Sequence, residues 1–151
     1  MADPEPMVIR TSVRDRLNQD AELKALKVRF EGRPAVAVSF TDRGLGFVYM
    51  GQDASDPNAA ARRNQPGEVD KRRIELFIAV GKEGAIGEDV EDDLSRIAHA
   101  IERVVASDQT HGLPGGAITE HVITTPALDG DGSLLVGTRI CVFHVNYLRC
   151  Y

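Results

Sequence analysis

Apolar side chains in the first fifty residues recur at two different spacings. Between residues 8 and 26 they fall about every third or fourth position, at Ile9, Val13, Leu17, Leu23 and Leu26. This spacing predicts an amphipathic helix, interrupted around residues 18–20. Residues 27–30 and 34–40 instead alternate on either side of a Gly-Arg-Pro turn, which predicts two strands. Residues 47–50 form a weaker apolar piece.

A long polar stretch follows, which we expect to form a loop or arm over residues 51–72. A polar segment of this length inside a compact domain is typically either disordered or functional. We also expect residues 1–7, which contain two prolines, to form a flexible leader. Five basic residues cluster around the polar stretch and are the candidate interface: Arg62, Arg63, Lys71, Arg72 and Arg73. Two interpretations stay open, a solvated loop and an arm that reaches a neighbouring acidic surface.

The second half of the chain predicts one buried strand, one long helix and a pair of strands. Within residues 71–80 the apolar residues become continuous from Leu76, as in a central strand. From residue 90 the apolar positions return to helical spacing, with Asp89 as the expected N-cap and Gly112 as the expected stop. Residues 117–125 and 137–148 are rich in β-branched residues and flank the turn sequence Asp-Gly-Asp-Gly at 129–132. This order predicts a single α+β domain over residues 1–151, with a mostly antiparallel sheet and two main helices on one face.

Composition excludes several classes of protein. The net charge of -5 disfavours binding to nucleic acid by bulk positive charge. The two cysteines, Cys141 and Cys150, do not make a disulfide framework, and we expect both to be reduced thiols. No window reaches the roughly 18 apolar residues that a membrane span needs, so we expect a soluble, cytosolic product.

The glycines that precede the long helix do not form a phosphate-binding loop. Gly81, Gly84 and Gly87 match neither the P-loop nor the dinucleotide fingerprint. The five acids between residues 88 and 93 would repel a phosphate at the start of that helix. A glycine-rich loop at 112–116 could bind an anion through its amides, but as a helix-to-strand connection it needs no such role, and we prefer that interpretation.

For the other candidate sites a structural interpretation is preferred. Asp129 and Asp131 resemble the start of a calcium loop, but position twelve of that loop would be Ile140, and Asp-Gly is itself a hairpin signal. The histidines have no zinc-binding spacing, although His144 could meet His121 across a sheet. We expect no cofactor, no metal and no catalytic residues. The alternative is a small α+β enzyme or ligand-binding domain that uses His121, His144, Asp129 and Asp131.

The order of these pieces resembles the tail terminator proteins of long-tailed bacteriophages and the tail-completion proteins of gene transfer agents. The matching segments are residues 9–17, 33–38, 72–80 and 93–102, followed by 129–132 and 137–147. The resemblance covers almost the whole chain but includes no diagnostic motif.

The resemblance implies a structural virion protein rather than an enzyme. Such a subunit forms a hexameric ring at the head-proximal end of the tail tube, stops tube growth and meets the head connector or stopper protein. Its implied partners are copies of itself, the tail tube protein and the connector, without a membrane or sequence-specific DNA binding, although DNA passes through the ring. The implied location is the virion tail, and the host cytoplasm during assembly. A head-completion or neck protein is the alternative within this class.

Overall fold

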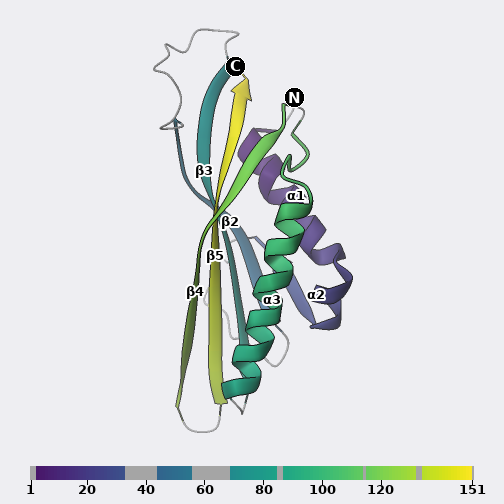
Figure 1. Ribbon diagram of the computed structural model, residues 1–151, viewed down its shortest axis with the longest axis vertical. Coiled ribbons are helices and arrows are strands. Elements are labelled where there is room, and N and C mark those ends of the chain that lie inside the picture. The colour runs from purple at the N-terminus through teal and green to yellow at the C-terminus, as the bar shows by residue number, and fades with distance from the viewer. Residues whose placement is uncertain are drawn as a thin grey trace.

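The fold is one five-stranded sheet with its helices along one face (Figure 1). The computed structural model describes residues 3–32, 44–55, 69–84, 87–113, 115–131 and 134–150. Its elements are α1 (Glu5–Gln19), α2 (Ala21–Ala25), β1 (Val28–Glu31), β2 (Gly44–Ser55), β3 (Val69–Gly84), α3 (Gly87–Ser107), β4 (Ala117–Asp131) and β5 (Leu134–Cys150). The strand order is β1-β2-β3-β5-β4; β1 is parallel to β2 and every other pair is antiparallel. The predicted α+β class and mostly antiparallel sheet are confirmed.

The core lies between the helices and one face of the sheet. Alternate residues of β3, from Ile74 to Val80, and of β5, from Cys141 to Tyr147, are buried toward the helices. The long helix α3 contributes the apolar stripe that the sequence predicts: Val90, Leu94, Ile97, Ala98, Ile101, Val104 and Val105. Because successive side chains of a strand point to opposite faces, the remaining residues of β3 and β5 lie on a second face that no described helix covers. This second face is called the open face below.

The helices begin and end at slightly different residues than the sequence predicts. Helix α1 begins at Glu5, so residues 5–7 are helical and do not belong to a flexible leader. The predicted interruption is confirmed at Asp20, whose carboxylate caps the short helix α2 by accepting from the Leu23 N–H. Helix α3 begins at Gly87, so Asp89 lies in its first turn and is not the N-cap. It ends at Ser107, before Gly112, and a turn follows.

The strands are longer than predicted and take in part of the expected polar loop. The strand at 27–30 is confirmed as β1, whereas the strand predicted at 34–40 lies outside the described residues. The weak apolar piece at 47–50 belongs to β2, which continues to Ser55, while β3 already begins at Val69. The loop predicted over 51–72 is therefore wrong at both ends, because polar residues of the two strands pair with each other beyond a bulge, as Asp53 does with Ile74 and Ser55 with Arg72. Residues 56–68 lie outside the described part of the chain.

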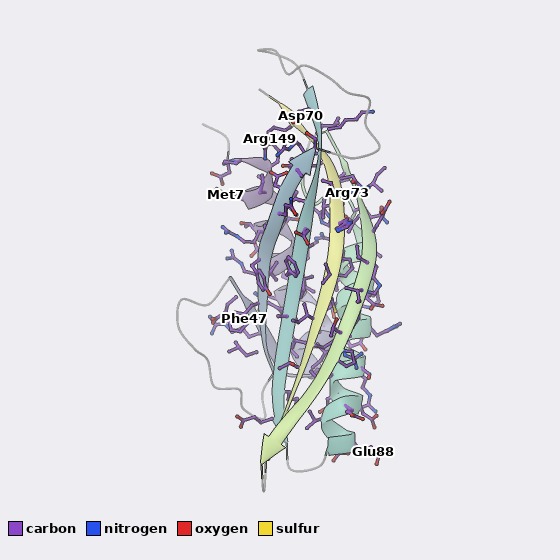
Figure 2. The ribbon with its side chains drawn as sticks, turned by 90° about the vertical axis from the view of Figure 1, so that its left-hand side faces the viewer. Met7, Phe47, Asp70, Arg73, Glu88 and Arg149 are labelled. Atoms are coloured by element: carbon purple, nitrogen blue, oxygen red, sulfur yellow. The ribbon has the colours of Figure 1, made fainter. Side chains whose placement is uncertain are left out.

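The predicted pair of strands near the C-terminus is confirmed as the hairpin of β4 and β5. Pairing continues to Asp131 and Leu134, so Asp129 and Asp131 lie in β4 and not in a four-residue turn. A β5 strand of 17 residues spans about 56 Å, whereas the 21 residues of α3 span about 31 Å. The sheet therefore extends beyond its helices. Asp70 and Arg149 lie near one of its ends and Glu88 near the other (Figure 2).

Candidate assembly surface

The candidate interface residues that the structure describes lie at the start of β3. Lys71, Arg72 and Arg73 are consecutive residues there, whereas Arg62 and Arg63 fall outside the described residues. Alternation along the strand sends Lys71 and Arg73 to the open face and Arg72 to the helix-bearing side of the sheet. The sequence groups the three together, but the strand divides them into two environments.

Arg72 belongs to a cluster of side chains that joins three strands at this end of the sheet. Its Nε lies 3.3 Å from the Asp53 carboxylate on β2, and its Nη1 lies 3.2 Å from the carboxylate of Asp70, which is buried. From β5, the Tyr147 hydroxyl donates to Asp53 over 2.8 Å, and the Arg149 guanidinium pairs with the same carboxylate. Asp53 thus accepts from groups on β3 and β5. The cluster holds together the end of β2 and the start of β3.

The protonation chemistry of this cluster agrees with a structural role. Burial is the largest single effect and would lower the pKa of Arg72, but the Asp53 charge together with the hydrogen bonds to Asp70 and Asp53 outweighs it, and the pKa is raised. Burial, with the hydrogen bond to Asp53, raises the pKa of the Tyr147 phenol far above its usual value. Both groups therefore keep their protons at any physiological pH. Arg72 acts as a fixed cross-link and not as a proton donor or a solvent-exposed contact.

The open face carries its charges in rows across the strands. In the first row Lys71 stands opposite Leu148, and in the second Arg73 donates to the Asn146 side chain over 2.8 Å. The third row places His144 between Glu75 and Glu120, its register partners on β3 and β4. Beyond these rows the face becomes apolar, with the rings of Tyr49 and Phe77 stacked 5.3 Å apart. The face thus runs from a basic row through an acidic row to an apolar block.

A hollow of 480 Å³ lies at the basic end of this face. The residues that line it include Lys71, Ile118, Asn146 and Leu148, together with the two glycines at 115–116. Ile118 and Leu148 are both exposed. The hollow thus combines one cation and one amide with exposed aliphatic groups.

The residues of the alternative enzyme hypothesis are not brought together. His121 lies on the helix side of β4, where its Nε2 is 2.8 Å from the Thr124 hydroxyl and 3.6 Å from Glu102 on α3. His144 lies on the open face, so the two histidines do not meet across the sheet as the sequence suggested. Asp129 and Asp131 are backbone members of the far end of β4, and eight residues along a strand from His121 to Asp129 correspond to about 26 Å.

One buried polar contact leaves no signal in the sequence. His111, fully buried in the turn after α3, lies 2.7 Å from the Arg16 guanidinium and 2.5 Å from the Thr119 hydroxyl. Burial and the neighbouring Arg16 charge lower the pKa of His111 to about 4. Since arginine can only donate, the His111 Nδ1 accepts from Arg16 and its Nε2–H donates to Thr119. The neutral ring therefore connects α1 to the start of β4.

Cys141 also serves the core rather than a site. It is buried on β5 as a free thiol, and burial raises its pKa to about 11. A protonated, enclosed thiol is a poor nucleophile. The side chain of Cys150 lies outside the described residues.

Two further observations are limited to the residues that the structure describes. No group of three or more histidine, cysteine and acidic side chains is arranged to hold a metal ion among them. Within the same part of the chain, no helix has the length and apolarity required to cross a membrane.

Comparison with known structures finds a similar fold in a chain of a gene transfer agent particle. No protein-family model matches the sequence, and no curated protein matches it significantly. A chain from the structure "Virion of native gene transfer agent (GTA) particle" superposes with a TM-score of 0.52 at 16% sequence identity, over 91% of this chain and 94% of that one. A chain of an extracellular contractile injection system, from its "sheath/tube terminator in extended state", gives a TM-score of 0.49 at 11% identity and covers 96% of this chain but 54% of the other. The resemblance drawn from the sequence is thus borne out at the level of the fold.

Proposed function

We propose that this protein is a structural subunit of the tail of a phage or phage-like particle. Its role is that of a tail terminator, which forms a ring on the head-proximal end of the tail tube, stops polymerisation and joins the tail to the head connector. The observation that carries the proposal is the fold shared with a gene transfer agent virion chain over nearly the full length of both proteins.

The arrangement of charges and apolar groups on the open face supports an assembly role. The face presents a basic row, an acidic row and an apolar block on one rigid sheet, which suits contact with another folded surface. Lys71 and Arg73 are the members of the candidate interface that lie on this face, and we assign partner contacts to them. Arg62 and Arg63 remain proposed contacts within the arm. Arg72, which is engaged with Asp53 and Asp70, is assigned to the support of that surface.

The proposed partners are further copies of this chain, the tail tube protein and the head connector or stopper. No cofactor takes part, and DNA passes through the ring without being read. The protein would act in the virion tail after assembly in the host cytoplasm. The alternative within the same class, a head-completion or neck protein, differs in that it binds the connector and not the tube.

The experiment that tests this proposal mixes the purified full chain with preassembled tail tubes and, separately, with connector rings. Light scattering over a concentration series first gives the mass of the protein alone, and cosedimentation then measures binding. A tail terminator is expected to pellet with tubes at a few copies per tube, whatever the tube length. Binding to connectors without tubes would support the neck alternative, and binding to neither would overturn the proposal.

A further inference from the structure

The two edges of the sheet differ in their capacity to pair with another strand. At the β1 edge, the side-chain amide of Asn18 donates to the Phe30 carbonyl over 2.9 Å and accepts from the Phe30 N–H over 2.8 Å. Helix α1 thereby occupies both outward-facing backbone groups of one residue in a strand only four residues long. At the other edge, β4 is 15 residues long, and no described strand pairs with its outer side. An unpaired strand of this length is a ready template for a further strand.

The exposed apolar side chains gather at this second edge. Among the described residues five large apolar side chains are exposed, and three of them lie on β4: Ile118 at 62%, Val122 at 49% and Ile123 at 52%. A fourth, Leu148 at 37%, lies on the neighbouring β5 beside the hollow. The fifth, Met7, is on α1. We call Ile118, Val122, Ile123 and Leu148, together with the outer backbone of β4 from Ala117 to residue 125, the β4 patch.

The charges beside the β4 patch favour a partner strand that is flanked by both an acidic and a basic group. From Ala117 to residue 125 the only acidic residue is Glu120, and there is no lysine or arginine. Lys71 lies at one end of the patch, beside Leu148, and Glu120 lies farther along β4. Pro126 follows, and since proline has no N–H it limits how far an added strand can continue. An acidic group facing Lys71 and a basic group facing Glu120 would complete the contact, and this chain, with 23 acidic and 18 basic residues, carries both.

We propose that the β4 patch is the surface on which each subunit receives a second copy of this chain. The inference rests on the ring assembly proposed above. A ring of identical subunits uses two different surfaces of each subunit, one toward each neighbour. Because β1 is only four residues long and Asn18 occupies the outer groups of its Phe30, the long strand β4 is the described sheet edge better suited to extension by a neighbour. Hydrogen bonds from the neighbour to the β4 backbone give the contact its strength, and Ile118, Val122 and Ile123 give it an apolar centre.

The test compares two single substitutions that place a lysine on the surface. Ile123→Lys introduces a charge into the β4 patch, whereas Met7→Lys makes the same change at the exposed apolar residue on α1 and serves as the matched control. Light scattering over a concentration series measures the mass of each protein alone. Cosedimentation then measures the binding of each protein to tail tubes. We expect Ile123→Lys to lower the apparent association constant at least tenfold, and Met7→Lys to leave it unchanged. Circular dichroism confirms that both variants are folded.

Hydrogen exchange of the wild-type protein provides a second readout that needs no variant. Amides of residues 117–125 that exchange quickly in the dilute protein should become protected in the assembled state, whether assembly occurs alone or on tubes. The β4 contact is overturned if the protein assembles while its β4 amides exchange at an unchanged rate, or if Ile123→Lys associates normally. Either result leaves the proposed tail function standing. Protection of β4 by tubes while the subunits stay isolated would identify the tube protein as the occupant and also overturn the inference. A chain that neither self-associates nor binds tubes would overturn the tail function itself, and the β4 contact with it.

Discussion

Asn18 on α1 and Phe30 on β1 are joined by a pair of hydrogen bonds that imitate a strand pairing. The Asn18 amide donates to the Phe30 carbonyl over 2.9 Å and accepts from its N–H over 2.8 Å. One side chain thus satisfies both outward-facing backbone groups of the residue, which would otherwise be left at an open sheet edge. The contact fixes the helix against the strand and also limits what that edge can bind.

Replacement of Asn18 by alanine should destabilise the fold and open the β1 edge. The variant leaves two partly buried backbone groups unpaired, so we expect the free energy of unfolding to fall by about 1 to 3 kcal/mol. Urea denaturation measures this, with Gln19→Ala, an exposed neighbour on the same helix, as the control. Equal stability of the two variants would mean that the Asn18 contact contributes nothing.

The buried His111 predicts a loss of stability in mild acid. Its pKa is about 4 in the folded protein, against about 6.5 in an unfolded chain, so the unfolded state binds the additional proton between these two pH values. The free energy of unfolding should therefore rise from pH 4 to pH 6.5, by up to about 1.4 kcal/mol per pH unit. Above pH 6.5 the contribution of His111 should no longer change with pH. Physically, protonation of Nδ1 would remove the bond from Arg16 and bring two cations together.

The contribution of His111 is isolated by a comparison with His111→Asn. Asparagine is chosen because residue 111 has a φ of 50°, a conformation that asparagine tolerates well. Urea denaturation between pH 4 and 7.5 should give a shallower slope for the variant than for the wild type. Parallel slopes would assign the acid sensitivity to other groups.

Neighbouring residues on β3 should behave differently when they are truncated. Arg72→Ala removes the cross-link between Asp53 and Asp70, and we expect a loss of about 2 kcal/mol in unfolding free energy. Lys71→Ala alters an exposed side chain and should change stability by less than about 0.5 kcal/mol while weakening assembly. Thermal unfolding and cosedimentation with tubes measure the two effects. The division of roles fails if Lys71→Ala unfolds the protein or if Arg72→Ala leaves its stability intact.

Gly46 is required by the aromatic ring that lies over it. A Cβ added at this position of β2 would overlap the ring of Phe30, which is buried. Gly46→Ala should lower the unfolding free energy by about 1 to 3 kcal/mol, because the tightly packed ring has to move. Gly32→Ala, where an added Cβ meets nothing, is the control. A Gly46→Ala protein as stable as Gly32→Ala would show that the ring moves at little cost.

The success of the sequence-based predictions depended on whether burial left a periodic pattern. Helix α3 was predicted because its stripe from Val90 to Val105 packs on the sheet, and the hairpin of β4 and β5 because β-branched residues repeat in both strands. The outer half of β2 was missed because its residues are polar and follow no periodic pattern. Asp53 and Ser55 are typical loop residues, and only their pairing with Ile74 and Arg72 makes them part of the strand.

The candidate surface was predicted only in part, for a similar reason. The sequence contains a basic run at Lys71, Arg72 and Arg73. It does not show that Arg72 points toward a buried carboxylate while its two neighbours lie on the open face. The contact of His111 with Arg16 and the pairing of Asn18 with Phe30 join residues far apart in the chain or on different elements. Contacts of this kind arise from packing and leave no local spacing to detect.

The most direct test of the central claim is to measure the length and end labelling of tail tubes that polymerise in the presence of this protein. Electron microscopy with a gold-tagged chain gives both quantities in one experiment. The account predicts that the label sits at one end of each tube and that tubes stop growing once it is bound. Label along the tube walls, or tubes that keep growing beyond a bound label, would contradict it.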